Sequence, residues 1–133
     1  MHNHEPDNYA CPFCRVLNQA KDSLDGTDIV FQDDTVTAFL GLGCWEHNPV
    51  DVLIVPNRHI ENLYDLPLEL VTPLHQVTRA MALALKSVFH CEGISTRQHN
   101  EPAGDQDVWH YHVHVTPCFA GDRFYENHKV PFP

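Results

Sequence analysis

Three histidines separated by single residues form the most reactive pattern in the sequence: His110, His112 and His114. Side chains of a β-strand alternate between its two faces, so the three imidazoles are expected on one face, with Tyr111 and Val113 on the other. Imidazole, with an unperturbed pKa of about 6.5, can act as a base, a nucleophile or a metal ligand near neutral pH. The pattern predicts a chemically active face, and a solvated polar face of an edge strand is the alternative.

The spacing of the three histidines does not favour a single metal ion bound by all of them. At about 3.3 Å per residue, the outer two lie roughly 13 Å apart along a strand, whereas the ligand atoms of one zinc ion lie about 2 Å from it. We therefore expect different roles for the three rings: a nucleophile flanked by groups that bind or protonate an anion.

A second pattern is the pair Cys11 and Cys14, with two residues between the cysteines. A thioredoxin-like redox pair would follow a strand, and no strand pattern precedes Cys11, so a zinc site is favoured. Two metal-free thiols beside an exposed His59 are the alternative. The other three of the five cysteines are scattered along the chain, which is typical of proteins from a reducing compartment.

Length and charge limit the function further. The 133 residues fit one domain, 1–133, with loosely held tails at about 1–8 and 125–133. The formal net charge of -10 disfavours binding to nucleic acid or to an anionic membrane surface. The polar start of the chain and the lack of a long apolar run predict neither a signal peptide nor a membrane span, and hence a cytoplasmic protein.

The elements expected to position the histidines belong to the α+β class. Apolar spacing predicts a helix from Leu66 to about His90, regular from Pro73 onward and stopped by Gly93. Its buried stripe is expected to comprise Leu70, Leu74, Val77, Met81, Leu85 and Val88. The remaining elements are strands, namely a hairpin of Ile29–Gln32 and Thr35–Leu40, a strand at Val52–Val55 buried on both faces, and strands at about Ile94–Gln98 and Val108–Thr116.

Taken together, these segments resemble the histidine-triad (HIT) family. The stretch His110–Thr116 resembles the family's alternation of three histidines with apolar residues on a strand. Asn100–Trp109 is similar to the family's Asn…Gly-Gln loop, and Asn48–His59 is similar to its Pro-Gly-His-(apolar)-Pro-x-x-His segment. With Phe39 and the cysteine pair, the resemblance covers roughly residues 9 to 125.

The resemblance implies a five-stranded antiparallel sheet with one long helix and a short amino-terminal segment, in a protein that dimerises side by side. It also implies that His112 attacks the α-phosphorus of a nucleotide derivative, with its tautomer fixed by the main-chain carbonyl of the first triad histidine. His114 would bind the phosphoryl oxygens or protonate the leaving group. Gln106 would assist catalysis, and the substrate would be bound by Asn100, Gln106, His114 and Phe39.

Zinc-bearing members of the family, and the related galactose-1-phosphate uridylyltransferases, add a metal to this picture. Carried over to this sequence, their ligands are Cys11, Cys14, His59 and His110. Such a Cys₂His₂ set closes a tetrahedral site, so the implied zinc is structural.

Three positions depart from the family pattern. Val50-Asp51 stands where many members have Gly-His, and Asp51 is expected to place an unfavourable carboxylate near the phosphate. Gly41 lies near a position where Asp or Asn often contacts ribose, and Cys118 stands where Arg commonly follows Pro. These changes bear on the substrate more than on the reaction.

Three functions are compatible with the sequence. The first is hydrolysis of a nucleoside phosphoramidate, an adenylylated metabolite or a dinucleoside polyphosphate. The second is transfer of the nucleotidyl group from His112 to a phosphate acceptor, and the third is a zinc-stabilised nucleotide-binding module without turnover.

Overall fold

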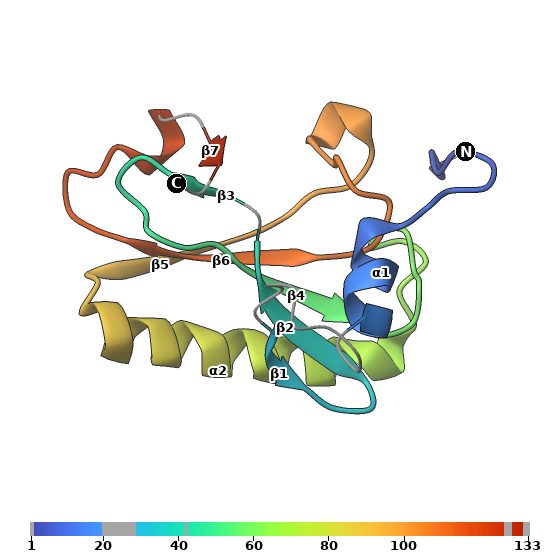
Figure 1. The fold of residues 1–133 in the computed structure, drawn as a ribbon, viewed down its shortest axis with the longest axis horizontal. Helices are drawn as coiled ribbons and strands as arrows, with labels where there is room; N and C mark the ends of the chain where they lie inside the picture. Colours follow the sequence, from blue (N-terminus) through green and yellow to red (C-terminus); the bar gives the residue numbers. More distant parts are fainter. Residues whose placement is uncertain (1, 20–28, 42, 127–128, 132–133) are drawn as a thin grey trace.

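The computed structural model describes residues 2–19, 29–41, 43–126 and 129–131. Five of its strands form an antiparallel sheet in the order β1-β2-β4-β6-β5 (Figure 1). Their bounds are β1 Ile29–Gln32, β2 Val36–Leu40, β4 Val52–Pro56, β6 Val113–Cys118 and β5 Gly93–Gln98. The expected α+β class, the sheet and its hairpin are thereby confirmed.

Strand β4 lies at the centre of the sheet, and all five of its residues are buried. Val52 and Ile54 belong to the core on one face, and Leu53 and Val55 belong to a second core on the other face. The strand is therefore covered on both sides, as its continuous apolar run predicts.

The helix α2 (Val71–Phe89) packs on one face of the sheet, after the short 3₁₀ turn η1 (Leu68–Leu70) (Figure 1). Leu74, Val77 and Leu85 are buried, but Val88 is 69% exposed and Phe89 packs on the core instead. The prediction of Val88 is wrong because a period of 3.6 residues carries the buried stripe from Leu85 to between 88 and 89.

The end of α2 also differs from the prediction. His90 adopts a left-handed conformation, with φ of 52°, and its N–H donates to the carbonyl of Lys86. Gly93 is not the stop but the first residue of β5. Pro73 is the third residue of α2, where its missing N–H has no partner within the helix to lose.

The opposite face of the sheet is covered by α1 (Pro12–Gln19), whose Phe13 is buried among Phe39, Leu53 and Val55. Because the triad histidines project from this same face, α1 lies beside them.

The segment ahead of α1, expected as a loose tail, is tied down by the buried Glu61. The carboxylate of Glu61 accepts hydrogen bonds from the main-chain N–H groups of His4 (2.8 Å) and Glu5 (3.0 Å). These bonds hold the amino-terminal arm, residues 2–9, against the body of the protein.

The carboxyl-terminal part forms a second, small sheet in which β3 (Gly43–Trp45) pairs with β7 (Lys129–Pro131). The 3₁₀ turn η3 (Phe124–Glu126) precedes β7, and η2 (Pro102–Gly104) lies in the loop before β6. Of the expected tail at 125–133, residues 127–128 and 132–133 lie outside the described part of the chain, as does Met1 of the amino-terminal tail.

Strand β6 begins at Val113, five residues later than predicted. The N–H of Tyr111 donates to the carbonyl of Ile60 at 2.6 Å, so this stretch pairs with a loop and not with a strand. His110 and His112 therefore lie in the segment that enters β6, where the His110 carbonyl is not used by a sheet ladder.

Among the described residues, no helix combines the length and the hydropathy that a membrane crossing requires.

Candidate active site and metal-binding cluster

The three histidines keep the predicted alternation even where the strand has not begun. Tyr111 and Val115 face α2 within the main core, whereas the rings of His112 and His114 lie together on the opposite face with their centroids 4.9 Å apart. All three histidines are buried, with at most 8% exposure.

His112 is held as a neutral ring with one available nitrogen. Its Nδ1 lies 2.7 Å from the carbonyl oxygen of His110, so Nδ1 carries the proton and donates it to this acceptor. Burial lowers the pKa of His112 to about 4, and the lone pair therefore resides on Nε2 at neutral pH. The carboxylate of Asp107, whose side chain is 79% exposed, stands 3.9 Å from Nε2 and shows that this atom lies just beneath the surface.

Aromatic side chains of α1 and β2 pack beside the His112 ring and fix its position. Phe13 of α1 meets it edge-on with centroids 5.0 Å apart, and Phe39 of β2 packs against Phe13 at 5.3 Å. Phe39 is only 3% exposed, so it supports Phe13 within the second core.

His114 is held by Asp51, one of the positions that depart from the family pattern. Its Nδ1 donates to Oδ2 of Asp51 at 2.9 Å, and the hydroxyl of Thr116 donates to Oδ1 of the same carboxylate at 2.9 Å. Asp51 is fully buried. Both of its oxygens are turned to side chains of β6. The effect of this carboxylate on a bound phosphate stays a prediction.

Cys118 stands where the family pattern has Arg, but another residue, Arg97, places a guanidinium near the triad. Arg97 on β5 lies opposite His114 in the sheet, donates to the Thr116 hydroxyl at 3.3 Å and stands 3.8 Å from Asp51. Its guanidinium lies over the rings of Trp45 (4.6 Å) and Phe124 (4.8 Å).

The side-chain amide groups of Gln106 and Asn100 form hydrogen bonds with the surrounding loops. Gln106 Nε2 donates to the carbonyls of Glu61 (2.7 Å) and Val108 (3.0 Å), and its Oε1 accepts from the N–H of Glu101. Asn100 accepts from the N–H of Leu63 at 2.8 Å and exchanges hydrogen bonds with Gln98. The structure places both residues as supports of the loops beside the triad, and their contact with a phosphate stays a prediction.

Gly41 packs closely on the main chain of Asp51. Its N–H donates to the carbonyl of Asp51 at 2.7 Å, and a Cβ atom at position 41 would lie 3.2 Å from the same oxygen. The glycine and Asp51 therefore pack directly on each other.

The four predicted metal ligands converge at one point beside the triad. The ligand atoms of Cys11, Cys14, His59 and His110 all lie within 4.8 Å of one another. The two Nδ1 atoms are 3.2 Å apart, Cys14 Sγ is 3.3 Å from His59 Nδ1, and Cys11 Sγ is 3.4 Å from His110 Nδ1. Ligand atoms around a tetrahedral zinc ion are separated by about 3.3–3.8 Å, and these three distances lie close to that range.

The hydrogen bonds of the second ring nitrogen, Nε2, orient both histidines as metal ligands. His110 Nε2 donates to the carbonyl of Pro56 at 2.9 Å, and His59 Nε2 donates to the carboxylate of Glu5 at 3.0 Å. Both Nδ1 lone pairs therefore point at the sulfur atoms, which is the arrangement found for zinc-bound histidines.

The electrostatics of the cluster agree with a cation site. For the protein groups alone, burial and the neighbouring Cys11 raise the pKa of the Cys14 thiol to about 12, and burial lowers the pKa of His110 to about 4. Two adjacent thiolates become favourable only with a positive charge between them. The donor set thus fits zinc, with all four positions supplied by the protein.

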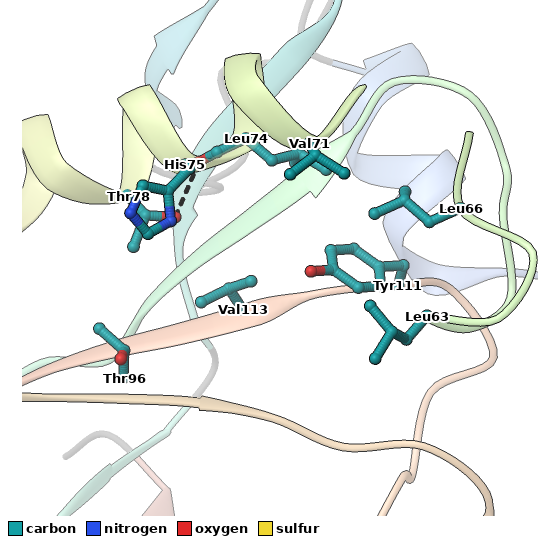
Figure 2. A pocket seen from close by; sticks show the side chains of 9 residues that line it. All are labelled: Leu63, Leu66, Val71, Leu74, His75, Thr78, Thr96, Tyr111 and Val113. Atoms are coloured by element: carbon teal, nitrogen blue, oxygen red, sulfur yellow. Dashed lines mark hydrogen bonds between the residues drawn. The ribbon is translucent and has the colours of Figure 1, made fainter. Parts of the chain in front are cut away.

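A cavity of about 180 Å³ lies on the other side of the sheet, between α2 and strands β5 and β6 (Figure 2). Val113 of β6 and Tyr111 of the segment before it line the cavity on one side, and Leu74 and Val71 line it from α2. None of its lining residues belongs to the triad or to the cysteine cluster, and the cavity is therefore not part of the candidate active site.

Sequence reasoning missed three groups that shape the site. Glu5 orients a metal-ligand candidate, Phe13 braces the His112 ring, and Arg97 stands beside Asp51. Only Phe13 carried a signal, as an apolar residue between the two cysteines; Glu5 and Arg97 look like ordinary surface charges until the chain is folded.

Comparison with known proteins gives consistent matches. The model of the HIT domain family matches residues 25–121. The protein Hit of Bacillus subtilis (strain 168) is 30% identical over 115 residues, which cover 86% of this chain and 75% of that protein. A purine nucleoside phosphoramidase of Escherichia coli (strain K12) is 32% identical over 90 residues, which cover 67% of this chain and 74% of that protein.

A solved structure bears on the cysteine cluster. The zinc-bound histidine triad family protein from Mycobacterium smegmatis superposes with a TM-score of 0.74 at 25% identity, covering 86% of this chain and 78% of the other.

Proposed function

Because the chain belongs to the HIT domain family, a family that includes nucleotide hydrolases and transferases, we propose that it hydrolyses a nucleotide derivative through a covalent bond between phosphorus and His112. The substrate classes that we propose are nucleoside phosphoramidates, adenylylated metabolites and dinucleoside polyphosphates. The name of the phosphoramidase relative favours the first of these classes.

One observation carries the proposal: the hydrogen bond from His112 Nδ1 to the His110 carbonyl. It leaves Nε2 as the nucleophilic atom of a neutral imidazole and supports the positive charge that develops on the ring during attack.

The reaction would proceed in two displacements. In the first, His112 Nε2 forms a bond to the α-phosphorus while the bond from phosphorus to the leaving nitrogen or oxygen breaks, and the leaving group takes a proton from His114. In the second, water loses a proton to His114 and attacks phosphorus, the bond to Nε2 breaks, and His112 returns to its neutral form. Covalent catalysis divides one difficult step into two easier ones.

The supporting residues have roles that follow from their contacts. Gln106 and Asn100 hold the loops that border the triad, and we propose that they thereby orient the phosphate. Phe39, a substrate-binding residue by the family resemblance, contacts Phe13, and Phe13 contacts the His112 ring.

We propose a structural zinc ion at Cys11, Cys14, His59 and His110. The ion would tie α1 and the amino-terminal arm to the segment that enters β6, and it would leave no coordination position for substrate. A cytoplasmic, reducing location would keep both cysteines available as thiolate ligands.

A homodimer is the proposed assembly, formed by a second copy of the chain at strand β5. In the described sheet β5 is an edge strand, and an unpaired edge favours pairing with another strand. The apolar cavity borders this edge, and the nearby Leu63 and Val71 are 48% and 46% exposed. Light scattering at micromolar concentration should give the mass of a dimer, and a monomer would contradict the proposal.

Product analysis tests the proposed function. Purified protein is incubated with adenosine 5′-phosphoramidate, an adenylylated amine and a diadenosine polyphosphate, each with and without added phosphate acceptors. Release of AMP independent of the acceptor is expected for the hydrolase, and formation of a new phosphoanhydride would identify the transferase. Protein that binds AMP but cleaves none of the three would be the nucleotide-binding module.

A further inference from the structure

Asp51 carries a fully buried carboxylate, which is rare in proteins. It lies between the end of β2 and the start of β4. Burial of an unpaired carboxylate is strongly unfavourable, so its partners must account for it.

Those partners place the negative charge directly behind the His114 ring. Oδ2 accepts from His114 Nδ1 at 2.9 Å and Oδ1 accepts from the Thr116 hydroxyl at 2.9 Å. The Arg97 guanidinium stands 3.8 Å from Oδ1 and also donates to the Thr116 hydroxyl, so a positive charge lies beside the buried carboxylate. The stronger contact is the hydrogen bond to His114, because it is nearly an ångström shorter than the ion pair.

The hydrogen bond decides which nitrogen of His114 is available. A carboxylate only accepts, so His114 Nδ1 must carry a proton, and Nε2 remains as the second nitrogen of a ring whose centroid is 4.9 Å from that of His112. The negative charge of Asp51 stabilises the imidazolium, in which Nε2 also carries a proton. An uncharged side chain at position 51 would supply no such charge.

We propose that Asp51 is a positioning residue that fixes the tautomer of His114 and stabilises its protonated form, so that His114 Nε2 can donate to the phosphoryl group or to the leaving group. The role of His114 as a proton donor rests on the proposed function. The structural part of the inference, that Nδ1 of His114 carries a proton, does not depend on that function.

The structural half is tested on the unaltered protein by NMR of ¹⁵N-labelled imidazole rings. We expect the His114 Nδ1 to be protonated and protected from exchange with water. A neutral ring with its proton on Nε2, or a ring exchanging between both tautomers, would overturn the proposal without requiring any variant to fold.

The chemical half is tested with Asp51→Asn, which keeps the shape of the side chain and can still accept the Nδ1 proton through its oxygen, but removes the charge. With adenosine 5′-phosphoramidate we expect kcat to fall about 100-fold with KM changed less than about threefold. Asp33→Asn is the matched control, because the Asp33 carboxylate likewise accepts two hydrogen bonds, from main-chain N–H groups in the turn between β1 and β2, and it does not contact the triad. A loss of kcat below about twofold in a folded Asp51→Asn protein would overturn the proposal.

A double-mutant cycle separates action through His114 from general structural damage. If Asp51 acts through His114, adding Asp51→Asn to His114→Asn should change the residual kcat by less than about twofold. Equal losses in both backgrounds would contradict the proposal. If the unaltered protein cleaved no nucleotide, the proposed function would fail, and the NMR experiment would still decide whether Asp51 fixes the His114 ring.

Discussion

His110 and His112 are two residues apart, both are buried, and both have a pKa lowered to about 4 by burial, yet the structure prepares them for different chemistry. His110 donates from Nε2 to the carbonyl of Pro56, so its Nδ1 lone pair faces the cysteines. His112 donates from Nδ1 to the carbonyl of His110, so its lone pair is on Nε2. Opposite tautomers therefore divide one row of histidines into a metal-ligand candidate and a nucleophile candidate.

In both cases a main-chain carbonyl selects the tautomer. Main-chain acceptors cannot be altered by exchanging a side chain, and their positions are set by how the segment before β6 packs on its neighbours. The Tyr111–Ile60 hydrogen bond, which keeps this segment out of the sheet ladder, is thus a condition for both sites. The comparison predicts that a substitution of His112 leaves metal binding intact, and that loss of the metal leaves the reaction at His112 intact.

The largest effect is expected at the nucleophile. His112→Asn removes the attacking nitrogen, so kcat should fall by about 10³-fold or more, while zinc content and the melting temperature remain close to those of the unaltered protein. Steady-state kinetics and metal analysis on the same sample measure both. His47→Asn, at an exposed histidine, is the control, and retention of more than about a tenth of the rate would refute the assignment.

The next largest effect is expected when the metal cluster is altered, and it concerns the stability of the fold. Cys11→Ser combined with Cys14→Ser should remove zinc and lower Tm by roughly 10 °C, because metal binding contributes directly to folding free energy. Calorimetry with metal analysis provides the measurement, and Cys44→Ser, remote from the cluster, is the control. The division of roles would be wrong if kcat per folded molecule fell together with the metal content.

A smaller effect is expected at Glu5, which accepts a hydrogen bond from the proposed ligand His59. Glu5→Gln should weaken zinc affinity about tenfold, since groups that orient metal ligands contribute about 10- to 100-fold. Competition with a chromophoric chelator measures the affinity, and Asp7→Asn tests the effect of removing a nearby exposed charge. Unchanged zinc affinity in Glu5→Gln would show that the arm does not orient His59.

The sequence was most informative where side-chain periodicity and chemistry coincide. The alternation of His110, His112 and His114 follows from the two-residue period of a strand. The hairpin follows from β-branched and aromatic runs on either side of a turn, and the doubly buried strand β4 follows from a continuous apolar run. The family resemblance provided the four cluster residues that the fold brings together.

The errors occurred where tertiary contacts outweigh local pattern. Apolar alternation alone cannot show that Tyr111 bonds to Ile60 and delays the start of β6, or that His90 accepts a left-handed conformation that glycine usually takes. The sequence also could not show the partners of Asp51, because His114 and Thr116 meet this carboxylate only when the chain is folded.

The central claim is that His112 Nε2 forms a bond to phosphorus, and rapid-quench mass spectrometry tests it most directly. Protein mixed with a molar excess of adenosine 5′-phosphoramidate is quenched within milliseconds, digested under conditions that preserve phosphorus–nitrogen bonds, and mapped by tandem mass spectrometry. The account predicts a transient adenylyl adduct on His112 that disappears as AMP accumulates and is not formed in His112→Asn. Consumption of the substrate without any adduct, or an adduct on a different residue, would contradict it.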